Sequence, residues 1–384
     1  MNRADAAPGS AAPRRPRVLH FVTGGFSGAT QVAVDLVAAH QQSGRFDAKL
    51  VLRRKRNTAP ERVAALRARG LDVQVVAGWS HAASIWQLWQ VCRAFRPDVL
   101  VAHGFSEHLW GRYAGLLAQV PRLVHVEHNS RERYTRWRLA QALWLSRRTQ
   151  ATVGCSEGVR QSLLQRGFPP ETTRAISNGI RLEPYLQAPP ALAERAPVIV
   201  MAARFARQKD HATLLRALAL LQARGLTPRL QLAGGGKASA QKAARQLCDQ
   251  LGLQQQVEFL GLSDKVPQLL QHSRICVLAT HYEGMPLSLI EGMAAGCAVV
   301  ASRVIGVQEV IDHGVNGLLA EHADPASMAD ALEQLLRDDA LAQRLATAAR
   351  QDALHNYSLE RMTRNYEDLF ESLLDPRPAQ EVNA

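Results

Sequence analysis

Cysteine is scarce in this 384-residue sequence, and long apolar runs are missing from it. The five cysteines are odd in number and widely scattered, and no two fall at the spacing of metal ligands, so a cysteine-based metal site is not expected. No apolar run approaches the roughly 20 residues that cross a bilayer. Residues 1–16 lack the apolar core of a signal peptide. We therefore expect a disordered N-terminal tail on a cytoplasmic protein with buried, reduced thiols.

Acidic residues are the minority, 34 against 46 basic residues, and the formal net charge is +12. This excess attracts an anionic membrane, a lipid-linked carrier or nucleic acid, and charge alone does not choose among them. The chain lacks the interleaved aromatic and basic residues of an RNA-binding sheet, so no nucleic-acid partner is expected. A nucleic-acid-binding protein, which only the charge favours, is the non-enzymatic alternative.

A basic stretch at 131–148 carries Tyr134, Trp137 and Trp144 on one predicted helix face. Such a face indicates one of two structures. Either the aromatic face binds peripherally at the inner face of the cytoplasmic membrane, or the aromatic residues pack in the core while the arginines of the same helix face water.

Length and pattern together predict two domains. A chain of 384 residues with 47% apolar content exceeds what one core usually supports. Short apolar runs alternate with helical patterns in two series, which predicts two doubly wound parallel α/β sheets with a cleft between them. We expect domains at 17–181 and 198–357, joined by a proline-rich linker at 182–197. The expected strands are 17–22, 49–52, 73–76, 98–103, 122–126, 151–155, 198–203, 230–233, 257–260, 275–278 and 297–301.

The most informative segment is 283–291, Glu-Gly-Met-Pro-Leu-Ser-Leu-Ile-Glu, which follows an apolar strand-like run. Gly284 permits a tight turn and Pro286 suits the first helical position, so a helix should begin there. The first amide groups of that helix would be free to bind a phosphate. They belong to Met285, Leu287 and Ser288.

Acidic and basic residues surround this predicted anion site. Glu283 precedes the helix and Glu291 lies inside it, so the two acids are expected to contact different parts of one ligand. Upstream, a predicted strand ends in Arg204, with Lys209 shortly after it. Because ligands bind at the carboxyl ends of parallel strands, these basic residues should supply the positive charge that a phosphate needs.

In this combination the chain resembles the retaining nucleotide-sugar glycosyltransferases of the two-domain GT-B fold, specifically glycosyltransferase family 4 (glycosyl transferases group 1). Further matching segments are Ser-Asn-Gly-Ile at 177–180 and Asn-Gly-Leu-Leu at 316–319. The resemblance implies two Rossmann-like domains facing a central cleft, and a last helix at about 358–374 that returns to the first domain. It also implies transfer from a nucleoside diphosphate sugar to a hydroxyl acceptor, with UDP the expected carrier. The expected acceptor is a glycan or a lipid-linked intermediate of lipopolysaccharide or surface polysaccharide synthesis.

The resemblance assigns roles to individual residues. Arg204 and Lys209 would grip the donor diphosphate, and Glu291 would bind the ribose. Glu283 and His128 would face the transferred sugar, and His103 is a weaker candidate of the same kind. The implied catalytic residues are His128, Glu283, Arg204 and Lys209. The implied donor-binding residues are Gly24, Gly25, Arg204, Lys209, Gly284, Met285, Pro286, Leu287 and Glu291. No metal and no cofactor are expected, because the basic residues stabilise the leaving group and no Asp-x-Asp element is present.

Some positions depart from the family pattern, and some alternatives stay open. Gly235 and Lys237 stand where the family has an acid and a proline, so the sugar and the nucleotide are left undecided. A plain strand-to-helix turn is the alternative for Gly24 and Gly25. A nucleotide-sugar 2-epimerase on the same fold is the alternative enzyme.

Overall fold

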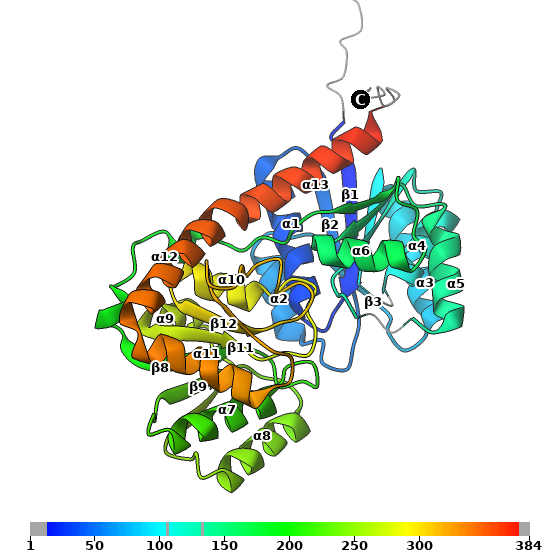
Figure 1. The fold of residues 1–384 in the computed structure, drawn as a ribbon. Coiled ribbons are helices and arrows are strands. Elements are labelled where there is room, and N and C mark those ends of the chain that lie inside the picture. Colours follow the sequence, from blue (N-terminus) through cyan, green and yellow to red (C-terminus); the bar gives the residue numbers. More distant parts are fainter. Residues whose placement is uncertain (1–13, 105–106, 132–133, 376–384) are drawn as a thin grey trace, which may run out of the picture.

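The computed structural model describes residues 14–104, 107–131 and 134–375, which form two α/β domains, each built on a parallel sheet (Figure 1). The N-terminal sheet has the strand order β3-β2-β1-β4-β5-β6-β7. Successive strands are added on one side of β1 up to β3 and on its other side from β4 onward, so the strand order reverses between β1 and β4. Its strands are β1 (Arg17–Thr23), β2 (Asp47–Arg53), β3 (Val73–Val76), β4 (Val99–His103), β5 (Arg122–Glu127), β6 (Ala151–Gly154) and β7 (Thr173–Ala175). Its helices are α1 (Gly28–Ser43), α2 (Pro60–Ala68), α3 (His81–Phe95), α4 (Glu107–Leu117), α5 (Arg136–Ser146) and α6 (Glu157–Gln165).

The C-terminal sheet has the order β10-β9-β8-β11-β12-β13 and reverses between β8 and β11. Open α/β sheets bind ligands at the carboxyl ends of the strands where the order reverses. The segments after β8 and β11 therefore meet at the expected place for a ligand. The strands are β8 (Ala196–Ala202), β9 (Arg229–Ala233), β10 (Val257–Gly261), β11 (Ser273–Leu278), β12 (Ala298–Ser302) and β13 (Leu318–Ala320). The helices are α7 (His211–Ala223), α8 (Ala238–Gln250), α9 (Val266–His272), α10 (Leu287–Ala294), α11 (Pro325–Arg337) and α12 (Asp339–Asn356).

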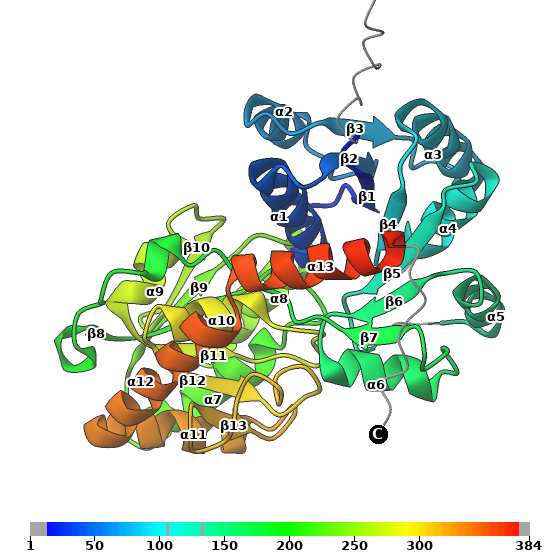
Figure 2. The ribbon, with the colours of Figure 1, turned by 90° about the horizontal axis from the view of Figure 1, so that it is seen from above.

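The last helix, α13 (Leu359–Leu374), leaves the C-terminal domain and lies against the N-terminal sheet (Figures 1 and 2). Its buried Tyr366 and Phe370 belong to one apolar cluster with residues of β1, β4 and β5. The crossover is tight, because a Cβ on Gly179 would lie 2.2 Å from Ser358 O. The last helix of the chain therefore completes the core of the domain in which the chain began.

Apolar runs became strands because they are buried between two layers of helices, where Val, Leu and Ile suit a parallel sheet. Every strand expected from the sequence is present, with ends within two residues of the expected ones. The two-domain α/β prediction is confirmed. Two details were wrong: β8 begins at Ala196, inside the expected linker, and Pro286 is the N-cap of α10 rather than its first helical residue.

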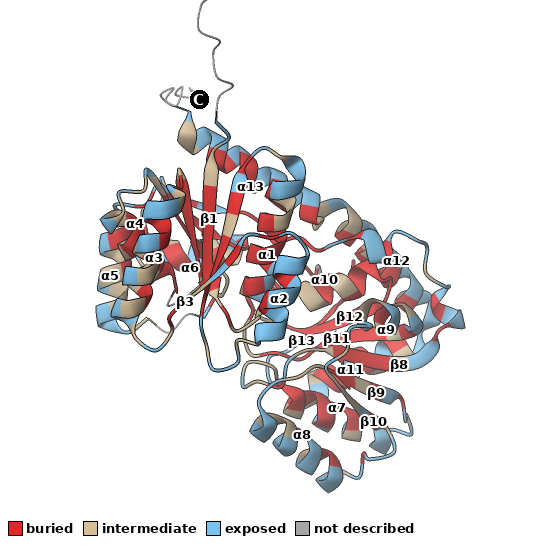
Figure 3. Ribbon diagram, turned by 180° about the vertical axis from the view of Figure 1, so that it is seen from behind, coloured by how far each residue is buried: buried red, intermediate tan, exposed pale blue. Residues whose placement is uncertain are grey.

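Burial follows these layers, with the strands and the inner helix faces buried and the outer helix faces exposed (Figure 3). All five cysteines are buried free thiols, as expected. Burial raises the pKa of Cys92 and Cys297 to about 12, so these thiols stay protonated. Among the described residues, no helix combines the length and the apolar character that crossing a membrane requires.

The ends of the chain were expected to be disordered at 1–16 and frayed beyond Asp375. Residues 1–13 and 376–384 lie outside the described part of the structure. Arg14 is described, and its side chain pairs with Asp98 at 2.9 Å. The N-terminal sheet therefore holds the chain from at least residue 14 onward.

Candidate active site

Glu283 lies in the loop between β11 and α10, and three side chains of the C-terminal domain hold its carboxylate. Oε1 accepts hydrogen bonds from Lys209 Nζ at 2.5 Å and from Thr280 Oγ1 at 2.7 Å. Gln208 Nε2 donates to Oε2 at 3.2 Å. The residue is only 6% exposed. A buried carboxylate with this many donors is fixed in position, which suits a group that orients a ligand.

The two basic residues expected to form one diphosphate clamp have different surroundings. Lys209 is mostly buried, and its ammonium group pairs with Glu283. Arg204, two residues beyond β8, is exposed, and its guanidinium has no hydrogen bond or ion pair within the described residues. The structure thus brings Lys209 to the acid predicted to face the sugar, and leaves Arg204 available to an anion.

The loop that carries Glu283 touches the N-terminal domain where β5 ends. Ser130 Oγ donates to Glu283 O at 2.5 Å. A Cβ on Gly284 would lie 2.1 Å from His128 O and 2.8 Å from Cys155 Sγ, so glycine is required here by the contact between domains. We call this contact the interdomain junction. It brings the Glu283 loop and His128 together from opposite halves of the chain.

His128 is a neutral ring with one unused nitrogen. Burial lowers its pKa to about 4. Its Nε2 lies 3.0 Å from Nδ1 of His103, whereas its Nδ1 is buried without a partner in the described part of the chain. An unpaired buried polar atom costs about 1–3 kcal/mol. This atom is therefore a candidate for a hydrogen bond with a substrate.

Glu291 lies on α10, close enough to the N-terminal domain for the charge of Asp35 to affect its pKa. Desolvation, with a smaller contribution from the charge of Asp35 on α1, raises its pKa to about 7. No described residue forms a hydrogen bond or an ion pair with its carboxylate, whereas Asp35 is paired with Arg181 at 2.6 Å. A carboxyl group with a strongly raised pKa between two domains is typical of a functional site.

The first backbone amides of α10 were predicted to be free, and the structure shows this. The N–H groups of Met285, Leu287 and Ser288 have no acceptor within the described residues. Met285 is buried, and its Sδ lies 3.1 Å from the backbone nitrogen of Asn178. The amides of Leu287 and Ser288 are in the first turn of α10, where the helix dipole favours negative charge, and Met285 precedes the N-cap.

The glycine turn after β1 has a packing explanation. Gly24 N donates to Arg53 O at 2.8 Å, and a Cβ on Gly24 would lie 2.7 Å from that oxygen. Thr58 Oγ1 donates to Gly24 O, and Asn57 Nδ2 donates to Gly25 O at 3.4 Å. The turn is thus fixed against the end of β2, as a plain strand-to-helix turn would be. A donor contact at Gly24 and Gly25 stays a prediction.

Several side chains at the site were not expected from the sequence. Gln208 and Thr280 hold Glu283, and Ser130 holds its backbone. Their only signal is a position shortly after a strand. His20, which is flanked by apolar residues within strand β1, gave a stronger signal, because a buried histidine needs a partner.

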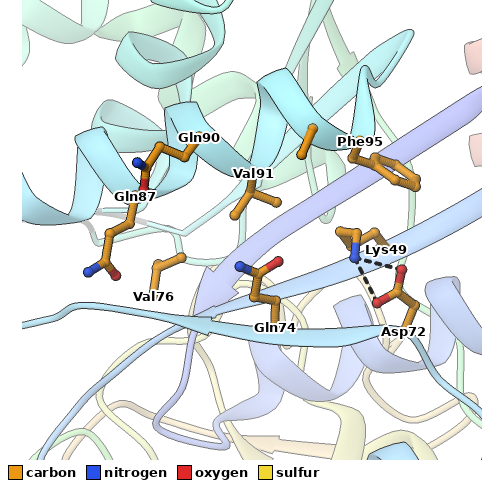
Figure 4. Close-up of a pocket in the computed structure, with 9 residues that line it drawn as sticks. Lys49, Asp72, Gln74, Val76, Gln87, Gln90, Val91 and Phe95 are labelled. Carbon is orange, nitrogen blue, oxygen red and sulfur yellow. Dashed lines mark hydrogen bonds and ion pairs between the residues drawn. The ribbon is translucent and has the colours of Figure 1, made fainter.

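A cavity of about 540 Å³ lies between β2, β3 and α3 (Figure 4). Its charged side chains, Lys49 and Asp72, form an ion pair at 2.6 Å. None of the predicted site residues lines it. With its charges already paired, this cavity offers no reactive group, and the interdomain junction remains the candidate site.

Comparison with known proteins bears on the whole chain. The protein-family model described as Glycosyltransferase Family 4 matches residues 26–184, and the family model described as Glycosyl transferases group 1 matches residues 185–352. N-acetyl-alpha-D-glucosaminyl L-malate synthase of Bacillus anthracis is 35% identical over 34% of this chain and 34% of its own. The lipopolysaccharide core biosynthesis glycosyltransferase LpsD of Rhizobium meliloti is 27% identical over 74% of this chain and 78% of its own.

The matches extend over only part of several curated relatives, from 34% to 63% of their length. A solved structure, HepE of Anabaena in complex with UDP-glucose, aligns with a TM-score of 0.82 at 21% identity over 93% of this chain and 99% of that one. At this identity the likeness shows the fold alone. Because the two family models follow one another along both domains, the chain belongs to the group 1 glycosyltransferases of family 4, with the GT-B fold.

Proposed function

We propose that this glycosyltransferase moves a sugar from uridine diphosphate to a hydroxyl acceptor, with retention at the anomeric carbon. The observation that carries the proposal is the Glu283–Lys209 pair, which lies where the C-terminal sheet reverses and next to His128 of the other domain. The UDP-glucose bound to HepE supports the choice of nucleotide. The names of LpsD and LpsE, both lipopolysaccharide core glycosyltransferases, support a glycan or lipid-linked acceptor.

In this proposal Lys209 and Arg204 stabilise the diphosphate as it leaves. An ammonium group has three donors, so Lys209 can serve Glu283 and a phosphate oxygen together. Arg204 adds an exposed guanidinium, whose planar donors suit phosphate. One such donor is typically worth about a hundred- to a thousandfold in rate. With two cations and the free amides of α10 in these roles, the proposed reaction uses neither a metal ion nor a cofactor.

Retention would come from attack on the same face that the diphosphate leaves. The bond from the anomeric carbon to the phosphate oxygen breaks, the bond to the acceptor oxygen forms, and the leaving phosphate oxygen takes the acceptor proton. A double displacement would need a carboxylate free to act as nucleophile. Glu283 is instead engaged by Lys209, Thr280 and Gln208. We assign Glu283 and His128 to orienting the sugar, and Glu291 to the ribose hydroxyls.

The proposal includes a cytoplasmic enzyme attached peripherally to the inner face of the membrane. Trp137 and Trp144 on α5 are 75% and 46% exposed, and Trp86 on α3 is 55% exposed. Tyr134, expected on the same face, is partly buried. The exposed tryptophans contradict the alternative of a wholly buried aromatic face. With the arginines of α5 beside them, they suit the interface of an anionic membrane, where a lipid-linked acceptor would be found.

A transfer assay with UDP-, GDP- and ADP-sugars tests the proposed reaction. Lys209→Ala should lower turnover at least about a hundredfold. The matched control is Arg207→Ala, which removes an exposed cation two positions earlier that has no partner in the described residues. It should leave turnover nearly unchanged. Product NMR should show the anomeric configuration of the donor. Inversion would refute the front-face mechanism, and normal turnover in Lys209→Ala would refute the role of that lysine.

The 2-epimerase alternative predicts a different product. Without an acceptor, an epimerase would invert carbon 2 of the sugar and keep the diphosphate linkage. The proposed transferase would leave the sugar configuration of the donor unchanged under those conditions. Incubation of the enzyme with donor alone, followed by NMR of the sugar nucleotide, separates the two reactions.

A further inference from the structure

Glu309, in the turn between β12 and β13, reaches from the C-terminal domain to the start of α6 in the N-terminal domain. Its Oε2 accepts a hydrogen bond from the backbone nitrogen of Glu157 at 2.7 Å, and its Oε1 accepts one from that of Gly158. Ser156, the N-cap of α6, accepts from the backbone nitrogen of Val159 at 3.2 Å. The first three amides of α6, which a helix leaves without partners, therefore all have acceptors, and the other domain supplies two of them.

Gly158 leaves room for this carboxylate. A Cβ at this position would lie 2.6 Å from Glu309 Oε1 and 2.7 Å from Ile305 Cγ2. Glycine weakens a helix of only nine residues, so its place here is explained by the close approach of the other domain. The carboxylate of Glu157 is engaged elsewhere, because it pairs with Arg160 at 2.7 Å. The helix dipole, which favours an anion at this end, therefore acts on the acid of the other domain.

The turn that carries Glu309 also packs directly on the loop that carries Glu283. A Cβ on Gly306 would lie 2.3 Å from Gly284 O and 2.9 Å from Glu283 O. Gly306 has a φ of +83°, so both its backbone and its surroundings require glycine. The turn is fixed to the main apolar core by three buried side chains, which are Val307, Val310 and Ile311. The turn and the Glu283 loop therefore move together as parts of the C-terminal domain.

The Glu283 loop is thus held between this turn and the N-terminal domain. On one side it meets Gly306, and on the other Gly284 lies against Cys155, the residue before the N-cap of α6. Burial raises the pKa of the Cys155 thiol well above its usual value, and the charges of nearby carboxylates, those of Glu309 and Glu283 among them, raise it further. The acid that binds α6 and the acid proposed to orient the sugar therefore both lie close to the same thiol.

Two stretches of chain connect the domains, and they cross side by side. Ile180 N donates to Tyr357 O at 2.9 Å, and Leu359 N donates to Ile180 O at 2.8 Å. Two adjacent crossings form a hinge, about which domains rotate unless other contacts oppose the motion. Contacts across the junction must then fix the angle between the domains, and the carboxylate of Glu309 supplies two of them.

We propose that Glu309 is a positioning residue for sugar transfer, which binds the first amides of α6, fixes the angle between the domains and so keeps Glu283 beside His128. We call its two hydrogen bonds, to the backbone nitrogens of Glu157 and Gly158, the α6 anchor. In the proposed function other residues bind the donor, and Glu309 acts through the Glu283 loop. The effect on transfer rests on the proposed function, whereas the anchor itself does not.

Amide spectra of protein labelled with nitrogen-15 glycine test the anchor without any activity. The chain has 26 glycines, and the signal that disappears in Gly158→Ala identifies Gly158. Its amide proton should lie downfield, because a hydrogen bond to a carboxylate is strong. Glu309→Gln removes the charge and leaves one acceptor oxygen, so it should move this signal upfield. Because Glu309 is exposed, this variant is expected to fold.

The matched control is Glu333→Gln, which removes the charge of a carboxylate held entirely within the C-terminal domain. Glu333 pairs with Arg224 at 2.7 Å and with Arg337 at 2.6 Å. The control should leave the Gly158 signal in place. An identical Gly158 signal in Glu309→Gln and Glu333→Gln would overturn the proposal.

Turnover then tests the positioning role. Glu309→Gln and Gly158→Ala change the anchor from opposite domains, and each should lower kcat at least about tenfold, since a displacement of about 1 Å can cost about a hundredfold. Their affinity for UDP should stay unchanged, because the proposed diphosphate and ribose contacts all lie in the C-terminal domain. The double variant should be no slower than the slower single variant, because both changes remove the same contact.

These outcomes separate the inference from a structural role and from the proposed function. A merely structural contact would lower Tm and leave kcat of the folded variants normal, and that result would overturn the proposal. Losses of kcat that multiply in the double variant would also overturn it, because two independent sites would then be at work. A wild-type protein that binds no UDP would refute the proposed function while leaving the Gly158 spectra in place.

Discussion

Burial strongly lowers the pKa of six described histidines, and we predict that the stability of the fold decreases steeply between pH 7 and pH 5.5. Burial lowers the pKa of four of them well below the usual value and that of the other two to about 4. They are His20, His103, His108 and His125 in the first group and His128 and His211 in the second. In the unfolded chain the same rings have a pKa of about 6.5. The folded state therefore binds fewer protons than the unfolded state, and acid favours unfolding.

The magnitude depends almost only on the unfolded chain, because the folded rings stay neutral in this range. Protonation of a ring with a pKa of about 6.5 costs about 1.2 kcal/mol of stability between pH 7 and 5.5, or roughly 7 kcal/mol for six rings. Glu291 acts in the opposite direction. Its folded pKa of about 7 lies above its unfolded value, so acid adds between about 1 and 2 kcal/mol. The histidines dominate, and the net loss of roughly 5 kcal/mol is a large part of a typical stability.

Calorimetry at several pH values measures this loss. Tm should fall by about 6 °C between pH 7 and 5.5, because 384 residues unfold with an entropy of about 0.8 kcal/mol/K. Unfolding at pH 5.5 should take up about five protons, measured from the buffer dependence of the enthalpy. His211→Phe, in a position stacked on Phe205 at 4.3 Å, should reduce that uptake by about one proton. Exposed His355, changed to Gln, should leave it unchanged. An equal Tm at both pH values would refute the reasoning.

Three further predictions follow from the junction and the exposed tryptophans. The folded pKa of Glu291 is raised to about 7, so the charged carboxylate destabilises the fold, and this destabilisation grows as the pH rises. In urea titrations at pH 8, Glu291→Gln should therefore be on the order of 2 kcal/mol more stable than wild type. The same variant should bind UDP more weakly. Gly284→Ala should lower the free energy of unfolding by about 1–3 kcal/mol in the same assay, because the added Cβ has no space. Gly28→Ala is the control, because its Cβ would have no atom within 4 Å and would cause no such clash. Trp137→Ala together with Trp144→Ala should weaken sedimentation with anionic vesicles and leave UDP affinity unchanged. Unaltered vesicle binding would remove these tryptophans from the membrane contact.

Much of the fold could be predicted because buried parallel strands are continuous apolar runs. The run at 73–76 became β3 with the same limits. The three-residue strands β7 and β13 were missed, because so short a segment has no pattern of its own and pairs only when a neighbouring strand presents its edge. Pro286 was misplaced by one position, since its backbone, with ψ of 87°, is not helical.

The site was predictable where one segment holds the chemistry and not where the register of the sheet decides. Glu283 and Lys209 both follow strands next to the reversal in the sheet, which made them candidates. Their direct pairing could not be predicted, because it depends on how two loops approach each other. The contact between His20 Nδ1 and His103 Nε2 at 3.0 Å was equally out of reach. It depends on the pairing of His20 with Val101, and no single segment determines the register of its own strand.

The measurement that tests the central claim most directly is calorimetric titration of UDP into wild type, Lys209→Ala and Arg207→Ala. If the Glu283–Lys209 pair at the junction is part of a nucleotide-sugar donor site, wild type and Arg207→Ala should bind UDP with the same affinity. Lys209→Ala should bind at least about tenfold more weakly, the loss expected of a charged hydrogen bond to phosphate. Equal affinity in all three proteins, or no binding by the wild type, would contradict this account of the site.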